Sequence, residues 1–145
     1  MNVIETNNLV KTYRQGDLEV QALNDVSIHF KQGEFTAIVG PSGSGKTTFL
    51  NAIGGLDTPT TGTVMINETD ITQLKSNQLI DFRLKNIGFV FQAYNLIPVL
   101  TAKENVEFIM LMQGAPSGKR DTRAKELLEA VGLSEQINRR PGQLS

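Results

Sequence analysis

The sequence predicts an α/β fold in which short strands come first, a strand–loop–helix unit follows, and helices close the chain. Three observations support this prediction. Residues 26–30 alternate apolar and polar side chains, as a strand with one exposed face does. Residues 35–39 are almost continuously apolar, as in a strand buried on both faces, and lead into a glycine-rich loop. Apolar side chains at helical spacing then recur in the second half of the chain.

Turn and cap signals divide the rest of the chain. Thr101 and Glu104 fit a capping box at the start of a helix that is apolar nearly all round, so we expect this helix in the core, with a partner surface as the alternative. Gly132 is well placed to end the last helix. We expect further strands at 3–7, 63–66 and 87–91, and helices at 46–53, 76–85, 101–112 and 120–131.

The composition indicates one globular domain. The 145 residues are 39% hydrophobic and 20% charged. Fourteen basic and fifteen acidic residues leave a net charge of −1, so we expect no nucleic-acid partner. The absence of cysteine excludes disulfides and cysteine-based metal sites. The longest apolar run, residues 108–112, is far shorter than the ~20 residues that span a bilayer, so a membrane role is expected to need a partner.

A glycine-rich loop supplies the strongest functional signal. Residues 40–47 match G-x-x-x-x-G-K-[ST], with a predicted strand before the loop and a predicted helix after it. Glycines allow backbone N–H groups to converge on phosphate oxygens, and the helix start adds partial positive charge. Lys46 would reach the β- and γ-phosphates, and the Thr47 hydroxyl would join a Mg²⁺ shell. We therefore predict a nucleoside polyphosphate at Gly40, Pro41, Ser42, Gly43, Ser44, Gly45, Lys46 and Thr47.

The loop alone does not choose among kinases, GTPases and transport ATPases, but longer stretches do. Four of them, LVKTY, ALNDVSIHFKQGEFTAIVGPSGSGKTTFLNAIGGLDTPTTG, IGFVFQAYNLIPVLTAKENV and RRPGQLS, together resemble the N-terminal part of an ABC transporter ATP-binding subunit. The resemblance is to the lipoprotein-release and macrolide-efflux (LolD/MacB-like) branch. It implies a P-loop NTPase of ABC type with an antiparallel β subdomain, a partial RecA-like core and a helical subdomain. The β subdomain and P-loop core would cover about 1–75, and the Q-loop strand and helical subdomain about 76–140.

The same resemblance assigns further site residues, with ATP and Mg²⁺ as cofactors. Tyr13 would stack on adenine, although from the residues alone a tyrosine that merely packs at a strand end is an equal alternative. Gln92 would be the Q-loop glutamine and, with Thr47, a Mg²⁺ ligand. Thr48 would lie close to the α-phosphate, and Ser145 would belong to the signature motif. His29 lies on the polar side of its strand and is expected at the surface.

The family also implies partners. We expect a transmembrane permease subunit or domain, an ATP-dependent head-to-tail homodimer, and a cytoplasmic position on the inner face of the cell membrane through that partner. The substrate stays open among lipoproteins, peptides and drugs. An ABC-type ATPase of cell division, repair or translation is the alternative; for a small P-loop kinase we identify neither an acceptor site nor a set of lid arginines.

The last two residues, Leu144 and Ser145, match the start of the family signature L-S-G-G-Q. The Walker B aspartate, the catalytic glutamate and the switch histidine follow the signature in the family and are not found in this sequence. We therefore expect a fragment truncated before the Walker B strand, which binds MgATP without useful hydrolysis because no nucleophile-positioning residue accompanies the phosphate cradle.

Overall fold

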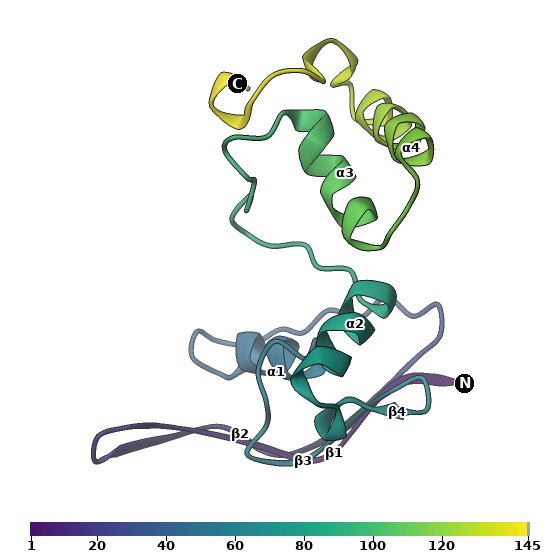
Figure 1. Ribbon diagram of the computed structural model, residues 1–145. Helices are drawn as coiled ribbons and strands as arrows, with labels where there is room; N and C mark the ends of the chain where they lie inside the picture. Colours follow the sequence, from purple (N-terminus) through teal and green to yellow (C-terminus); the bar gives the residue numbers. More distant parts are fainter. Residues whose placement is uncertain (145) are drawn as a thin grey trace. The chain divides into compact units, whose positions relative to one another are not determined.

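A computed structural model describes residues 1–144 and divides the chain into two compact units, Met1–Arg83 and a second unit from Leu84 onward. The sequence analysis placed the division of the chain near residue 75, and that subdomain assignment stays a prediction. Figure 1 follows the chain from the purple N-terminal strand to the yellow C-terminal turns. Each unit is described by itself below.

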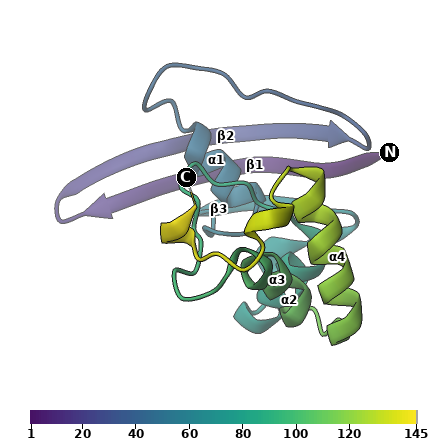
Figure 2. The same cartoon turned by 90° about the horizontal axis from the view of Figure 1, so that it is seen from above.

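The first unit is built on an antiparallel sheet of four strands in the order β2-β1-β3-β4. The first two strands form a long hairpin, closed by a turn at Gly16, that crosses the view in Figure 2. The predicted strands at 3–7, 26–30 and 63–66 are confirmed as parts of β1, β2 and β3. The strands are β1 (Asn2–Gln15), β2 (Leu18–Lys31), β3 (Thr61–Ile66) and β4 (Thr69–Asp70).

One helix supplies much of the core of this unit. Phe49 of α1 (Lys46–Ile53) is buried, and its ring centroid lies 6.3 Å from that of Phe30 on β2. The sheet contributes Leu9, Leu23 and Val64 to the same buried set. Burial of side chains of this size stabilises the contact by roughly 1.5–3 kcal/mol each, so the contact fixes α1 on the hairpin.

The four predicted helices are confirmed, and the cap signals hold. Thr101 and Glu104 form the predicted capping box, and Gly132 takes a positive φ of 74° just after the last helix. The helices are α1, α2 (Ser76–Asn86), α3 (Ala102–Met112) and α4 (Ser117–Ala130), with short 3₁₀ turns η1 (Ile71–Gln73), η2 (Ser134–Gln136) and η3 (Pro141–Gln143).

Two predicted strands are absent from the part of the chain that the structure describes. Residues 35–39 are irregular, and Phe35 and Val39 are 97% and 86% exposed. Residues 87–91 are irregular as well, with Phe89 and Phe91 stacked at 5.7 Å between ring centroids. A doubly buried strand needs a hydrogen-bonded neighbour on each side, and among residues 1–144 no strand pairs with either segment.

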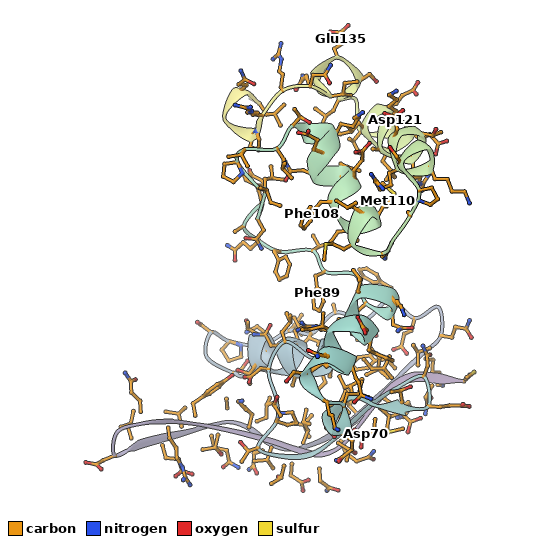
Figure 3. All side chains as sticks on the ribbon, viewed as in Figure 1. Asp70, Phe89, Phe108, Met110, Asp121 and Glu135 are labelled. Carbon is orange, nitrogen blue, oxygen red and sulfur yellow. The ribbon has the colours of Figure 1, made fainter. Side chains whose placement is uncertain are left out.

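The prediction that α3 is a core helix is wrong. Phe108, Ile109, Leu111 and Met112 are all exposed, and Ala102 is the one buried residue of the helix. In the second unit α3 packs against α4, and a pair of helices covers only one face of each partner. Figure 3 shows Phe108 and Met110 on α3.

The apolar face predicted for the last helix is partly correct. Ala124 and Leu128 of α4 are buried, but Leu127 and Val131 are exposed. Within the described residues, no helix combines the length and the apolar character needed to span a bilayer.

Asp121 links the two helices of the second unit through charge. Its carboxylate accepts hydrogen bonds from Lys103 of α3 at 2.6 Å and from Lys125 of α4 at 2.7 Å. These two hydrogen bonds, from Lys103 first and then Lys125, lower the pKa of Asp121 from 3.8 to about 2. Its label lies on α4 in Figure 3.

We predict that Asp121→Asn lowers the thermal unfolding midpoint of the helices at pH 7. Because the pKa of Asp121 is lower in the folded state, the stabilisation is present above the unfolded value of 3.8 and is lost as the pH falls toward about 2. Far-UV circular dichroism at a series of pH values checks this, with Asp81→Asn on α2 as the matched control. A difference between wild type and Asp121→Asn that does not shrink in acid contradicts the assignment.

Candidate nucleotide-binding site

The glycine-rich loop lies in the first unit, directly before α1. Gly43 and Gly45 have φ values of 78° and 85°, in the left-handed region that glycine adopts without steric cost. The N–H of Ser44 donates to the carbonyl of Pro41 at 3.3 Å and closes a turn. The loop thus makes a tight turn that ends at the start of the helix.

Gly45 is held against the hairpin. A Cβ at this position would overlap the backbone carbonyl of Ala22 on β2 and lie 3.3 Å from Leu23 Cδ2. Gly43 has a similar backbone conformation, but a Cβ there would meet nothing within 4 Å. The sequence motif fixes a glycine at position 45 and leaves position 43 open, and the structure shows that Gly45 is required by packing as well as by φ.

Lys46 folds back over the loop. Its ammonium donates to the carbonyls of Gly40 at 2.9 Å and Pro41 at 2.7 Å, and to Ser44 Oγ at 3.4 Å. An ammonium has three N–H donors, so these acceptors satisfy it. A phosphate oxygen is a stronger acceptor than a carbonyl because it is charged, so an incoming anion can take the place of these partners.

The start of α1 faces the same loop. The N-cap residue Gly45 offers no side-chain acceptor to the first amides of the helix. Those amides, with the partial positive charge of the helix N-terminus, suit a phosphate group. In this first turn Thr47 is exposed and Thr48 is half-buried.

Tyr13 lies on β1 in the same unit and is 42% exposed. Its hydroxyl donates to Asp57 Oδ2 at 2.7 Å. Lys11 Nζ lies 4.9 Å from the centre of the Tyr13 ring and 2.5 Å from Asp57 Oδ1. Burial raises the pKa of Asp57, but the hydrogen bonds from Lys11 and Tyr13 outweigh burial and hold this pKa below its ordinary value.

Sequence reasoning did not find Lys11 and Asp57. They are 46 residues apart. Lys11 lies in LVKTY and Asp57 in the stretch that ends GGLDTPTTG, but nothing in either stretch indicates that the two side chains pair. Only the pairing of β1 with the segment after α1 brings them together.

The remaining predicted residues lie elsewhere. Gln92 is exposed in an irregular segment of the second unit, and its role as a Mg²⁺ ligand stays a prediction. Ser145 lies outside the described residues. His29 is exposed, as predicted. Within residues 1–144, no group of three or more acidic or histidine side chains gathers as a metal centre would require.

The fold and the loop define a P-loop nucleotide-binding domain. The ABC transporter family model matches residues 23–145. The chain therefore belongs to the ABC transporter family, and the resemblance noted in its sequence is confirmed.

Relatives of this chain are found among ATP-binding proteins of transporters. It is 48% identical over 143 residues to an uncharacterised ABC transporter ATP-binding protein of Thermotoga maritima, covering 99% of this chain and 61% of the relative. It is 43% identical to the macrolide export ATP-binding/permease protein MacB of Brucella abortus, covering 99% of this chain and 22% of MacB. The lipoprotein-releasing system ATP-binding protein LolD of Colwellia psychrerythraea is also 43% identical, with 99% and 55% covered. The chain thus spans less than two thirds of each of these relatives.

A solved structure confirms the fold class. The dimeric post-hydrolysis state of the ATP-binding cassette MJ0796 bound to ADP and Pi superposes with a TM-score of 0.89 at 46% sequence identity. The superposition covers 98% of this chain and 63% of that cassette. The antiparallel sheet and helices described above are therefore part of an ABC-type ATPase fold.

We predict that Gly45→Ala destabilises the first unit more than Gly43→Ala does. Both substitutions place a side chain at positive φ, which costs about 1–2 kcal/mol, but only at Gly45 does the new Cβ meet a backbone carbonyl. Gly118→Ala on α4, where φ is not positive and a Cβ meets nothing within 4 Å, is the control and should stabilise by up to about 1 kcal/mol. Chemical denaturation measures all three. Equal losses at Gly43 and Gly45 would contradict the packing role of Gly45.

Proposed function

We propose that this chain binds MgATP at residues 40–47 and that the protein it represents is the ATP-binding subunit of an ABC transporter. One observation carries the proposal. The loop backbone is left-handed at Gly43 and Gly45, and the Lys46 ammonium lies over the loop, hydrogen-bonded to the carbonyls of Gly40 and Pro41 directly before the N-terminus of α1. Family membership selects ATP among the nucleotides that such a loop accepts.

Each predicted site residue has a role in this proposal. The loop amides and Lys46 hold the β- and γ-phosphates, and Thr48 lies by the α-phosphate. Thr47 and Gln92 ligate Mg²⁺. Tyr13 stacks on adenine, and its exposed ring position on β1 supports this. Ser145 reaches the γ-phosphate held by a second copy.

The whole protein is proposed to act with partners. MacB joins ATP-binding and permease functions in one name, and LolD is named as part of a lipoprotein-releasing system. The structural neighbour MJ0796 is described as dimeric with ADP and Pi bound. These names support a dimer that acts with a transmembrane permease in export or lipoprotein release. In our proposal the dimer is head to tail, lies on the inner face of the cell membrane through the permease, and uses ATP hydrolysis to drive the transport. None of the three favours cell division, repair or translation.

We predict that MgATP binds the chain and that Lys46→Ala weakens binding about 10-fold, since hydrogen bonds to a charged phosphate, which contribute about 1.5–3 kcal/mol, replace neutral ones that contribute about 0.5–1.5 kcal/mol. Lys119→Ala, an exposed lysine on α4, is the matched control and should bind as wild type. Isothermal titration calorimetry measures all three. An unchanged affinity of Lys46→Ala for MgATP would show that the nucleotide does not bind at this loop.

We further predict that the 145 residues alone bind ATP without useful turnover. Phosphoryl transfer to water needs a residue that positions the nucleophile as well as a phosphate cradle, and the family motifs that supply it are not in this sequence. Phosphate release under saturating MgATP is the measurement, and it should match the buffer blank. Phosphate release above that blank, abolished by Lys46→Ala, would show that these residues hydrolyse ATP and that the prediction is wrong.

A further inference from the structure

A polar bridge of three side chains ties β1 to the segment that follows α1. Asp57 uses both carboxylate oxygens in it: Oδ1 accepts from Lys11 Nζ at 2.5 Å, and Oδ2 accepts from the Tyr13 hydroxyl at 2.7 Å. Lys11 also donates to the carbonyl of Thr58 at 2.6 Å. The side chains of Lys11 and Asp57 are only 13% and 29% exposed, so the pair is shielded more than an ordinary surface ion pair.

The backbone at Asp57 is fixed to the helix that carries the phosphate loop. The N–H groups of Leu56 and Asp57 both donate to the carbonyl of Asn51 in α1, at 2.8 and 3.2 Å. Asn51 lies in the helical turn after Lys46, so Asp57 moves with α1. The Asp57 carboxylate therefore connects the Tyr13 hydroxyl to α1, the helix that follows the phosphate loop.

The neighbouring backbone strengthens this link. Thr60 donates its N–H to the carbonyl of Val10 at 2.8 Å, and its hydroxyl accepts from the N–H of Thr12 at 2.9 Å. The strand on which Tyr13 lies is thus bonded on both sides of residue 11 to the segment after α1. Little freedom remains for β1 to slide relative to that helix.

The bridge also orients the Tyr13 ring. Its hydroxyl is held by Asp57, and the Lys11 ammonium lies over the ring, 4.9 Å from its centre. A cation on one face leaves the opposite face for a flat, aromatic ligand. A ring whose rotamer is set in advance loses less entropy when it stacks.

We propose that Asp57, acting with Lys11, is a positioning residue that holds the Tyr13 ring ready for the nucleobase and sets its distance from the phosphate loop. This inference rests on the proposed function, in which Tyr13 stacks on adenine. Asp57 touches no nucleotide in this proposal and acts through the tyrosine hydroxyl. Its contribution therefore belongs to the base and not to the phosphates.

The test compares two ligands that share phosphates and differ in the base: MgATP and magnesium tripolyphosphate. Asp57→Ala and Tyr13→Phe are each expected to weaken MgATP binding about 3- to 10-fold, a part of the 1–3 kcal/mol that a stacked base contributes. Tripolyphosphate binding should stay within about twofold, which also shows that the phosphate loop of each variant is folded. The double variant should bind MgATP no worse than either single one, because both changes break the same hydrogen bond. Asp81→Ala and Tyr94→Phe are the matched controls.

A fluorescence readout needs no nucleotide. The chain has two tyrosines and no tryptophan, so Tyr94→Phe leaves Tyr13 as its one fluorophore. A carboxylate that accepts the tyrosine proton quenches emission, and Asp57→Ala in this background should therefore raise it. Emission unchanged by Asp57→Ala overturns the orientation of the ring by Asp57.

The outcomes separate this inference from the function on which it rests. Equal losses for MgATP and tripolyphosphate in Asp57→Ala assign the residue to fold stability alone and overturn the inference. Unchanged MgATP binding, or additive losses in the double variant, overturns it as well. Failure of both ligands to bind in a Lys46-dependent manner overturns the proposed function and the inference with it.

Discussion

The site depends on one close approach, that of the loop backbone at Gly45 to the carbonyl of Ala22 on β2. The left-handed φ of 85° turns the chain from loop into helix at the point where any Cβ would meet that carbonyl. The contact fixes the origin of α1 against the hairpin, and buried Phe49 holds the next turn of the helix on the same surface. The direction of the first amides of α1 and the reach of Lys46 both follow from this placement.

The engagement of Lys46 sets the balance of forces for anion binding. Its ammonium already has carbonyl partners at 2.9 and 2.7 Å, so an arriving phosphate replaces hydrogen bonds and does not simply add them. The net gain at the lysine is the difference between a charge-assisted bond and a neutral one, not the whole of the former. The amides at the start of α1, which no side chain caps at Gly45, contribute without such an exchange. The affinity of the loop is accordingly shared between the backbone and the lysine.

The sequence predicted what is local and missed what depends on distant partners. Residues 46–53 were predicted as a helix and form one with the same bounds, because glycines flank the helix at both ends. The capping box at Thr101 was also predicted correctly, because its hydrogen bonds join residues only three positions apart in the sequence. Residues 35–39 have the composition of a buried strand, but a strand exists only with neighbours, and the described residues supply none. For α3, apolar composition predicted burial, whereas exposure depends on how many elements pack around a helix.

The same contrast runs through the site itself. The phosphate loop occupies eight consecutive positions and could be identified from the sequence alone, whereas Tyr13 and Asp57 are 44 residues apart and only the fold joins them.

In the polar bridge of Lys11, Tyr13 and Asp57, a change to one side chain alters the contacts of the others. Loss of Asp57 leaves the largely buried Lys11 ammonium with only the Thr58 carbonyl among the two acceptors it has in the structure. A half-satisfied buried charge is worse than an apolar replacement of the whole group, because its desolvation is no longer offset. Simultaneous replacement of Lys11, Tyr13 and Asp57 by apolar residues can therefore preserve the attachment of β1 to the segment after α1. It cannot preserve an aromatic ring held by its hydroxyl, and the polar bridge is for that reason better explained by what the ring binds than by the stability of the strand.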